Sequence, residues 1–216
     1  LEGLGVDALG INCGLGPKQM KEIVKELLKY ASIPVIVNPN AGLPRSENGK
    51  TVFDVGAEEF AEDMEEIVTM GAWFAGGCCG TTPAHIQAMV EKCKEITSVP
   101  ITPKNYTFVT SYSTAVELGG IPVIIGERIN PTGKKALQAQ LREGSFEKVI
   151  QFAEEQEACG AKVLDINMGM SGIDEKASML RALEEVSGVT NLPLSLDSSY
   201  VEVLEAALRN YPGRAL

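Results

Sequence analysis

The chain has 216 residues and a formal net charge of −10 at pH 7, with 19 Lys and Arg against 29 Asp and Glu. Neither half is basic, so we expect no nucleic-acid partner, because such binding needs a cationic surface. No signal peptide opens the sequence, and glycines and a proline interrupt the uncharged stretch 67–90, so we expect no membrane span. The odd number of cysteines, five, favours a reducing cytoplasm over a disulfide framework.

Short apolar runs alternate with helical patterns along the first half of the chain. A run rich in apolar or β-branched residues, bounded by Gly, Pro or Asn, is typical of a buried strand. The predicted strands are residues 6–13, 34–38 and 73–79. The predicted helices follow them at about 18–30, 57–70 and 83–96. The last helix has a proline in its first turn, where the missing N–H is harmless.

The second half repeats this alternation. The predicted strands are residues 123–127, 162–167 and 193–197. The predicted helices are about 146–159, 175–187 and 201–209. Between the halves, residues 97–120 are rich in Thr, Ser and Tyr and have no amphipathic period, which predicts an unstructured linker between two domains. Six β/α units indicate an α/β protein with parallel sheets covered by helices.

Each predicted strand ends in residues that can bind ligands or act in catalysis. In parallel α/β folds, functional side chains gather at the carboxyl ends of the strands. The pairs or groups at the six ends are Asn12 with Cys13, Asn38 with Asn40, Cys78 with Cys79, Glu127 with Asn130, Asp165 with Asn167, and Asp197 with Ser198. This regularity predicts a functional site in each half.

Cys13, Cys78 and Cys79 form the first candidate site. Adjacent residues of a strand point to opposite faces, so the vicinal pair needs its flanking glycines to turn both sulfurs inward. Three thiolates with an open fourth position would make a reactive zinc site, and a glycine turn with incidental cysteines is the alternative. Cys93 and Cys159 lie in helical patterns and are expected to be buried apolar residues. The single histidine, His85, has no partner histidine and is expected to be structural.

Several motifs carry a family resemblance. GINC at 10–13, NPNAGLP at 38–44 and GGCCGTTPAHI at 76–86 resemble the last units of the homocysteine S-methyltransferase (β/α)8 barrel. GERINPTGKK at 126–135, LDINMG at 164–169 and LSLDSS at 194–199 resemble the first units of the pterin-binding methyltransferase barrel, a relative of dihydropteroate synthase. The two modules in this order are similar to the cobalamin-dependent methionine synthase family.

The resemblance implies ligands for both halves. Zinc held by Cys13, Cys78 and Cys79 would activate homocysteine, and Asn40 would contact this substrate or take the open ligand position. The pterin of 5-methyltetrahydrofolate would bind Asp197, whose carboxylate can accept paired N–H donors. The residues implied to line the same pocket are Glu127, Asn130, Asp165 and Asn167. For these four, capping of a loop backbone remains the alternative. Cobalamin would be bound by a module outside these residues.

The implied fold is parts of two consecutive TIM (β/α)8 barrels, because three units cannot close an eight-stranded barrel. Residues 1–96 would be the end of the homocysteine barrel, 97–120 the linker and 121–216 the start of the pterin barrel, with its next strand beginning near 214–216. The implied activity is methyl transfer from 5-methyltetrahydrofolate through cobalamin to homocysteine, which this chain alone is not expected to complete. A corrinoid or pterin methyltransferase with another acceptor, or a non-catalytic zinc- or pterin-binding fragment, is the alternative.

Overall fold

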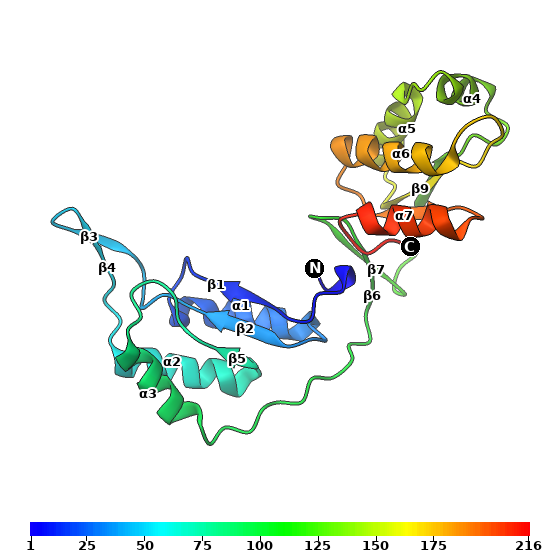
Figure 1. The fold of residues 1–216 in the computed structure, drawn as a ribbon. Coiled ribbons are helices and arrows are strands. Elements are labelled where there is room, and N and C mark those ends of the chain that lie inside the picture. Colours follow the sequence, from blue (N-terminus) through cyan, green and yellow to red (C-terminus); the bar gives the residue numbers. More distant parts are fainter. The chain divides into compact units, whose positions relative to one another are not determined.

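The computed structural model describes residues 1–216, which divide into two compact units, Leu1–Asn105 and Tyr106–Leu216. Both units are mixed α/β structures with a parallel sheet, as the sequence predicted (Figure 1). None of the helices combines the length and the apolar character needed to cross a membrane.

The first unit is built around a three-stranded parallel sheet with the strand order β1-β2-β5. Its strands are β1 (Leu9–Asn12), β2 (Val35–Asn38) and β5 (Phe74–Ala75). Its helices are the short 3-10 helix η1 (Glu2–Leu4), α1 (Pro17–Tyr30), α2 (Ala57–Met70) and α3 (Pro83–Cys93). Asn12 is paired with Asn38 in the ladder, so the ends of β1 and β2 lie at the same level.

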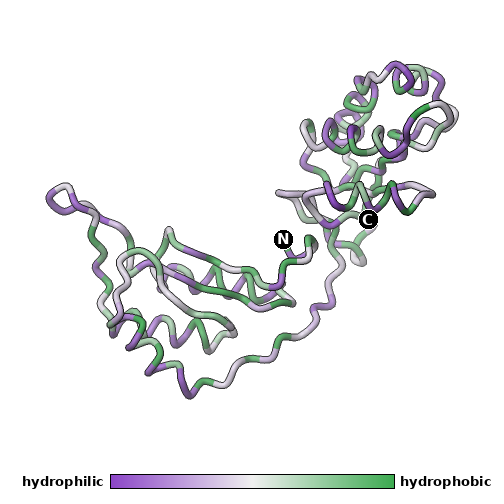
Figure 2. Tube along the Cα trace, viewed as in Figure 1, coloured by the Kyte–Doolittle hydropathy of each residue, from purple (hydrophilic) through white to green (hydrophobic).

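Amphipathic helices close the core of this unit. The side chains of Met20 and Val24 on α1 and of Phe60, Met64 and Ile67 on α2 are fully buried, at the spacing of one helix face. Figure 2 shows the corresponding alternation of hydrophobic and hydrophilic residues along the helices. Lys21 of α1 also binds Asp63 and Glu66 of α2 at 2.7 and 2.6 Å, which ties the two helices together at their polar edge.

Two features of the first unit differ from the sequence prediction. The third strand ends at Ala75, not at residue 79, so both vicinal cysteines lie in a loop. An unpredicted hairpin, β3 (Arg45–Glu47) and β4 (Lys50–Val52), follows the loop after β2. Its turn uses Asn48 and Gly49 at positive φ, a typical hairpin signal, but its strands are polar and exposed and carry no hydrophobic alternation to predict them.

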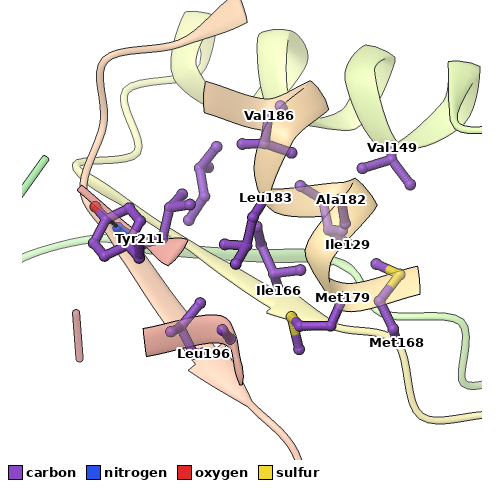
Figure 3. Close-up of a cluster of buried hydrophobic side chains, with 14 of the residues drawn as sticks. Ile129, Val149, Ile166, Met168, Met179, Ala182, Leu183, Val186, Leu196 and Tyr211 are labelled. Carbon is purple, nitrogen blue, oxygen red and sulfur yellow. Dashed lines mark hydrogen bonds between the residues drawn. The ribbon is translucent and has the colours of Figure 1, made fainter. Parts of the chain in front are cut away.

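The second unit contains a parallel sheet with the order β10-β9-β8. Its strands are β8 (Ile125–Ile129), β9 (Val163–Asn167) and β10 (Leu194–Asp197). Its helices are α4 (Lys135–Arg142), which was not predicted, α5 (Glu147–Ala158), α6 (Glu175–Val189) and α7 (Val201–Asn210). Met179, Ala182, Leu183 and Val186 line one side of α6 and pack with Ile166 of β9 in the core (Figure 3).

The predicted linker contains regular structure, which corrects the interpretation of 97–120 as unstructured. Thr107–Thr110 (β6) and Ala115–Leu118 (β7) form an antiparallel hairpin within the second unit. Thr110 forms a bridge with Arg214, and the buried hydroxyl of Tyr211 donates to the Thr110 carbonyl at 2.9 Å. These partners lie about a hundred positions away, so no local pattern in the sequence could reveal them.

Both sheets are open at their edges. At one edge of the second sheet, the N–H of Leu216 donates to the Leu194 carbonyl, and the Leu216 carbonyl accepts from the N–H of Leu196, each at 3.1 Å. These two bonds have the pattern of a parallel ladder. Residue 216 therefore lies beside β10, where the sequence predicted the next strand to begin.

Tyr211 provides a test of how the hairpin is attached. Its hydroxyl accepts the Leu194 N–H at 3.0 Å and donates to Thr110. Tyr211→Phe leaves the Leu194 N–H unpaired, whereas the Thr110 carbonyl still accepts from the Arg214 N–H at 3.0 Å. One unpaired buried donor should lower the free energy of unfolding by about 1–3 kcal/mol. Tyr112→Phe, at an exposed position of the same hairpin, should change it by less than about 0.5 kcal/mol. Urea unfolding measures both, and equal stabilities of the two variants would contradict the attachment.

Candidate functional site

Three cysteine thiols converge at the carboxyl edge of the first sheet. The Sγ atom of Cys79 lies 3.7 Å from that of Cys13 and 3.9 Å from that of Cys78, and all three sulfurs lie within 4.8 Å of one another. Three sulfurs bound to one zinc ion at the usual 2.3 Å in a tetrahedron lie about 3.8 Å apart. The thiols therefore already have nearly the spacing that a shared zinc ion requires.

Backbone hydrogen bonds between loops hold the cysteines at this edge. The N–H of Cys78 donates to the Pro39 carbonyl at 2.8 Å, and the carbonyl of Cys79 accepts from Ala41 at 2.9 Å. Cys13 adopts a left-handed conformation with φ 63°, and its N–H donates to the Asn38 carbonyl. The end of the central strand β2 and the loop after it are thus hydrogen-bonded to the loops that follow both outer strands.

Asn40 lies in the loop after β2. Its side chain is 2 % exposed, and its Oδ1 accepts the N–H of Cys79 at 3.1 Å. Its side-chain amide also hydrogen-bonds to the thiol of Cys13 and helps to lower the pKa of that thiol. The buried Asn40 therefore contacts the backbone of Cys79 and the thiol of Cys13.

The thiols of Cys13 and Cys79 ionise differently. The pKa of Cys13 is lowered, first by hydrogen bonding from the Gly14 backbone N–H and then by the thiols of Cys79 and Cys78. The pKa of Cys79 is raised to about 11, because its proton bonds Cys13 and because negative charge on its neighbours opposes its own. A thiolate therefore forms more readily at Cys13 than at Cys79, and a bound cation would stabilise negative charge at this cluster.

The carboxyl edge of the second sheet holds a network of carboxylates, amides and hydroxyls. Asp165 and Asn167 alternate with buried apolar residues on β9, and Ser195 and Asp197 do so on β10. Ser195 donates to Asp165 at 2.6 Å, and the Asn167 Nδ2 donates to Asp197 at 2.8 Å. The ladder pairs these residues directly, so the predicted residues of the two strands are brought together.

Glu127 and Asn130 at the end of β8 complete the predicted set. The Nδ2 of Asn130 donates to the carboxylate of Glu127 at 2.7 Å, while its Oδ1 accepts the N–H of Thr132 at 2.9 Å. The pKa of Asp165 is raised, chiefly by burial and further by the charges of Asp197 and Glu127, against the lowering effect of the Ser195 hydroxyl. Three carboxylates therefore act on one another at this edge.

Two polar residues of this region, Ser195 and Glu175, were not predicted, whereas Ser198 was already placed at a strand end. Ser195 bonds Asp165, and the Ser198 hydroxyl donates to Glu175 of α6 at 2.5 Å. Period-2 alternation already placed Ser195 on the face of Asp197, so that signal could have identified it. Glu175 could not be found in this way, because it comes from a helix in another part of the sequence.

The side-chain positions test three further predictions, for His85, Cys93 and Cys159. His85 is structural, as expected: its Nδ1 contacts Thr82 at the start of α3, and its Nε2 lies 3.0 Å from the Val55 carbonyl. Cys93 packs against the core of the first unit. The prediction for Cys159 was wrong, because this residue follows the last turn of α5 and is exposed.

Comparisons with known proteins relate both halves of the chain to known families. Residues 1–93 match the homocysteine S-methyltransferase family model, and residues 126–216 match the pterin binding enzyme family model. Over the whole chain, 36% of residues are identical to methionine synthase of Mycobacterium leprae (strain TN). The chain is homologous to methionine synthases. Identity to the methionine synthase of Mycobacterium tuberculosis (strain ATCC 25618 / H37Rv) is 34% over 99% of the chain. The chain spans 19% and 18% of these two relatives.

The raised pKa of Asp165 predicts a pH-dependent stability. In the unfolded chain an aspartate has a pKa of about 3.9. In the folded chain the pKa of Asp165 is raised, so its carboxyl keeps its proton to higher pH. The folded state then binds more protons, so stability falls as pH rises from that value through the folded pKa. In Asp165→Asn the amide oxygen still accepts from Ser195 but does not titrate. Urea unfolding should show that the variant gains stability, relative to the parent, between acidic and neutral pH; a constant difference would contradict this.

Proposed function

We propose that the protein is a methyltransferase that makes methionine, with 5-methyltetrahydrofolate as methyl donor and homocysteine as acceptor. The convergence of Cys13, Cys78 and Cys79 at the spacing of a shared zinc ion is the observation that carries this proposal. The match of residues 1–93, which contain these cysteines, to the homocysteine S-methyltransferase family model and of residues 126–216 to the pterin binding enzyme family model supports it. Cobalamin, held by a module outside these residues, would be the methyl carrier, and each sheet would form part of a (β/α)8 barrel.

On the homocysteine side, the donor set suits zinc. Zinc prefers thiolates, and a reactive site needs three protein ligands with a fourth position left for the substrate. When bound, the zinc would lower the pKa of the homocysteine thiol so that a nucleophilic thiolate exists near neutral pH. Asn40 and the backbone bonds from Pro39 and Ala41 would hold the three cysteines in place while the substrate enters and leaves.

On the pterin side, the residues at the ends of β9 and β10 would bind and orient the ring. The carboxylate of Asp197 is exposed at the strand end and can accept paired N–H donors. Asn167 contacts Asp197 and fixes the direction of its carboxylate. Asp165, with its raised pKa, and the Glu127–Asn130 pair would supply groups that can donate or accept as the ring's protonation changes.

Zinc binding can be tested at Cys79. The Cys79→Ser variant should bind zinc more than about 100-fold more weakly, because even an outer partner of a metal ligand typically contributes about 10- to 100-fold. The matched control is Cys159→Ser, which removes an exposed thiol outside the cluster and should leave zinc binding unchanged. Competition with a chromophoric chelator measures both. Stoichiometric, tight zinc in Cys79→Ser would remove the cluster from the mechanism.

Pterin binding can be tested at Asp197. In a protein with the complete pterin domain, Asp197→Asn keeps the shape of the side chain but replaces one acceptor oxygen with an NH₂ group. The affinity for methyltetrahydrofolate should fall by about ten-fold or more, the value of one charge-assisted hydrogen bond. Calorimetry measures the folate affinity, and zinc content serves as the internal control. Unchanged folate affinity would exclude Asp197 from the site, and loss of zinc would show that the two sites are not independent.

A further inference from the structure

Gln156 of α5 is a buried polar side chain outside every motif considered so far. It is 7 % exposed, and both ends of its amide are used. Its Oε1 accepts the backbone N–H of Arg128 in β8 at 2.7 Å, and its Nε2 donates to the Phe152 carbonyl at 2.9 Å. A polar side chain is buried in this way only when its hydrogen bonds are made, so Gln156 is held firmly against β8.

The strand that Gln156 contacts contains a bulge. Gly126 pairs with Leu164 and Ile129 pairs with Ile166, so β8 has one more residue than β9 between the two pairs. Glu127 and Arg128 therefore both lie opposite Asp165. An extra residue in a strand leaves a backbone group without its ladder partner, and the N–H of Arg128 is satisfied by Gln156.

The bulge changes which side chains share a face of β8. In a regular strand, residues three apart point to opposite faces. Here Ile129 is fully buried in the core, as is its ladder partner Ile166 on β9. The Arg128 guanidinium lies over the Phe152 ring on α5. Glu127 and Asn130 instead lie on the same side and form a 2.7 Å hydrogen bond. Asn130 is the first residue after β8, so this contact lies at the strand end that follows the bulge.

We propose that Gln156 is a positioning residue of the pterin site: it holds the bulge of β8, and the bulge brings Glu127 and Asn130 together at the strand end. The role at the pterin rests on the proposed function, whereas the placement of Glu127 does not. Gly126 leaves room for this contact, because a Cβ at this position would lie 2.7 Å from the Oε1 of Gln156 and would displace the amide.

The first measurement reports on the position of the Glu127 carboxylate and needs no folate. Glu127 contributes to the raised pKa of Asp165, so moving its carboxylate away should lower that pKa. Carbon-13 NMR of the Asp165 carboxyl in the 216-residue chain should show a lower pKa in Gln156→Leu, as in Glu127→Gln. The matched control is Gln151→Leu, an exposed glutamine of the same helix that bonds only Glu155. An unchanged titration in folded Gln156→Leu would overturn the proposal.

The second measurement is methyltetrahydrofolate affinity in a protein with the complete pterin domain. Gln156→Leu should weaken binding by about ten-fold, the value of one lost contact, and add nothing to the effect of Glu127→Gln. Gln156→Glu, which keeps an acceptor oxygen, should retain affinity, and its failure to do so while folded would overturn the proposal even if Gln156→Leu unfolds. If the Asp165 titration responds but the parent binds no folate, the positioning role stands and the proposed function fails.

Discussion

Parallel pairing of the strands places all the carboxyl ends of a sheet at one edge, and both candidate sites depend on this constraint. In the first unit the pairing of Asn12 with Asn38 brings the loops after β1 and β2 to the same level. In the second unit the pairing of Asp197 with Asn167 does the same for β10 and β9. Residues separated by 30 or more positions thereby become neighbours, although no local interaction joins them.

Local departures from regular strand geometry then aim the functional groups. The strand β5 ends before the cysteine pair, so Cys78 and Cys79 escape the alternation that would point them apart. Gly80 follows at φ 81°, a conformation that suits glycine. In the second unit the bulge of β8 brings Glu127 and Asn130 to one side. In both units, the regular sheet places the functional residues at one edge, and a local irregularity of the backbone sets the direction of their side chains.

The two sites share an electrostatic property: each holds one acidic group whose pKa is raised beside other acidic groups. The pKa of Cys79 is raised to about 11 beside two other thiols, and the pKa of Asp165 is raised by burial and by neighbouring carboxylates. A cation at the thiols, or a ligand with N–H donors at the carboxylates, would relieve this opposition. The proposed zinc ion is such a cation, and the proposed pterin is such a ligand with N–H donors.

The sequence by itself determined the order of the six β/α units and the residues at the strand ends, because hydrophobic periodicity and glycine or proline boundaries are local signals. It also indicated the family through short motifs that are continuous in the chain. Only the tertiary structure decided which atoms meet: the sulfur spacing around Cys79, the bond from Asn40, and the clamp of Gln156 on β8. The hairpin 107–118, which bonds Tyr211 and Arg214, was likewise beyond prediction. Contacts between distant residues depend on how the elements pack, and packing leaves no local pattern to read.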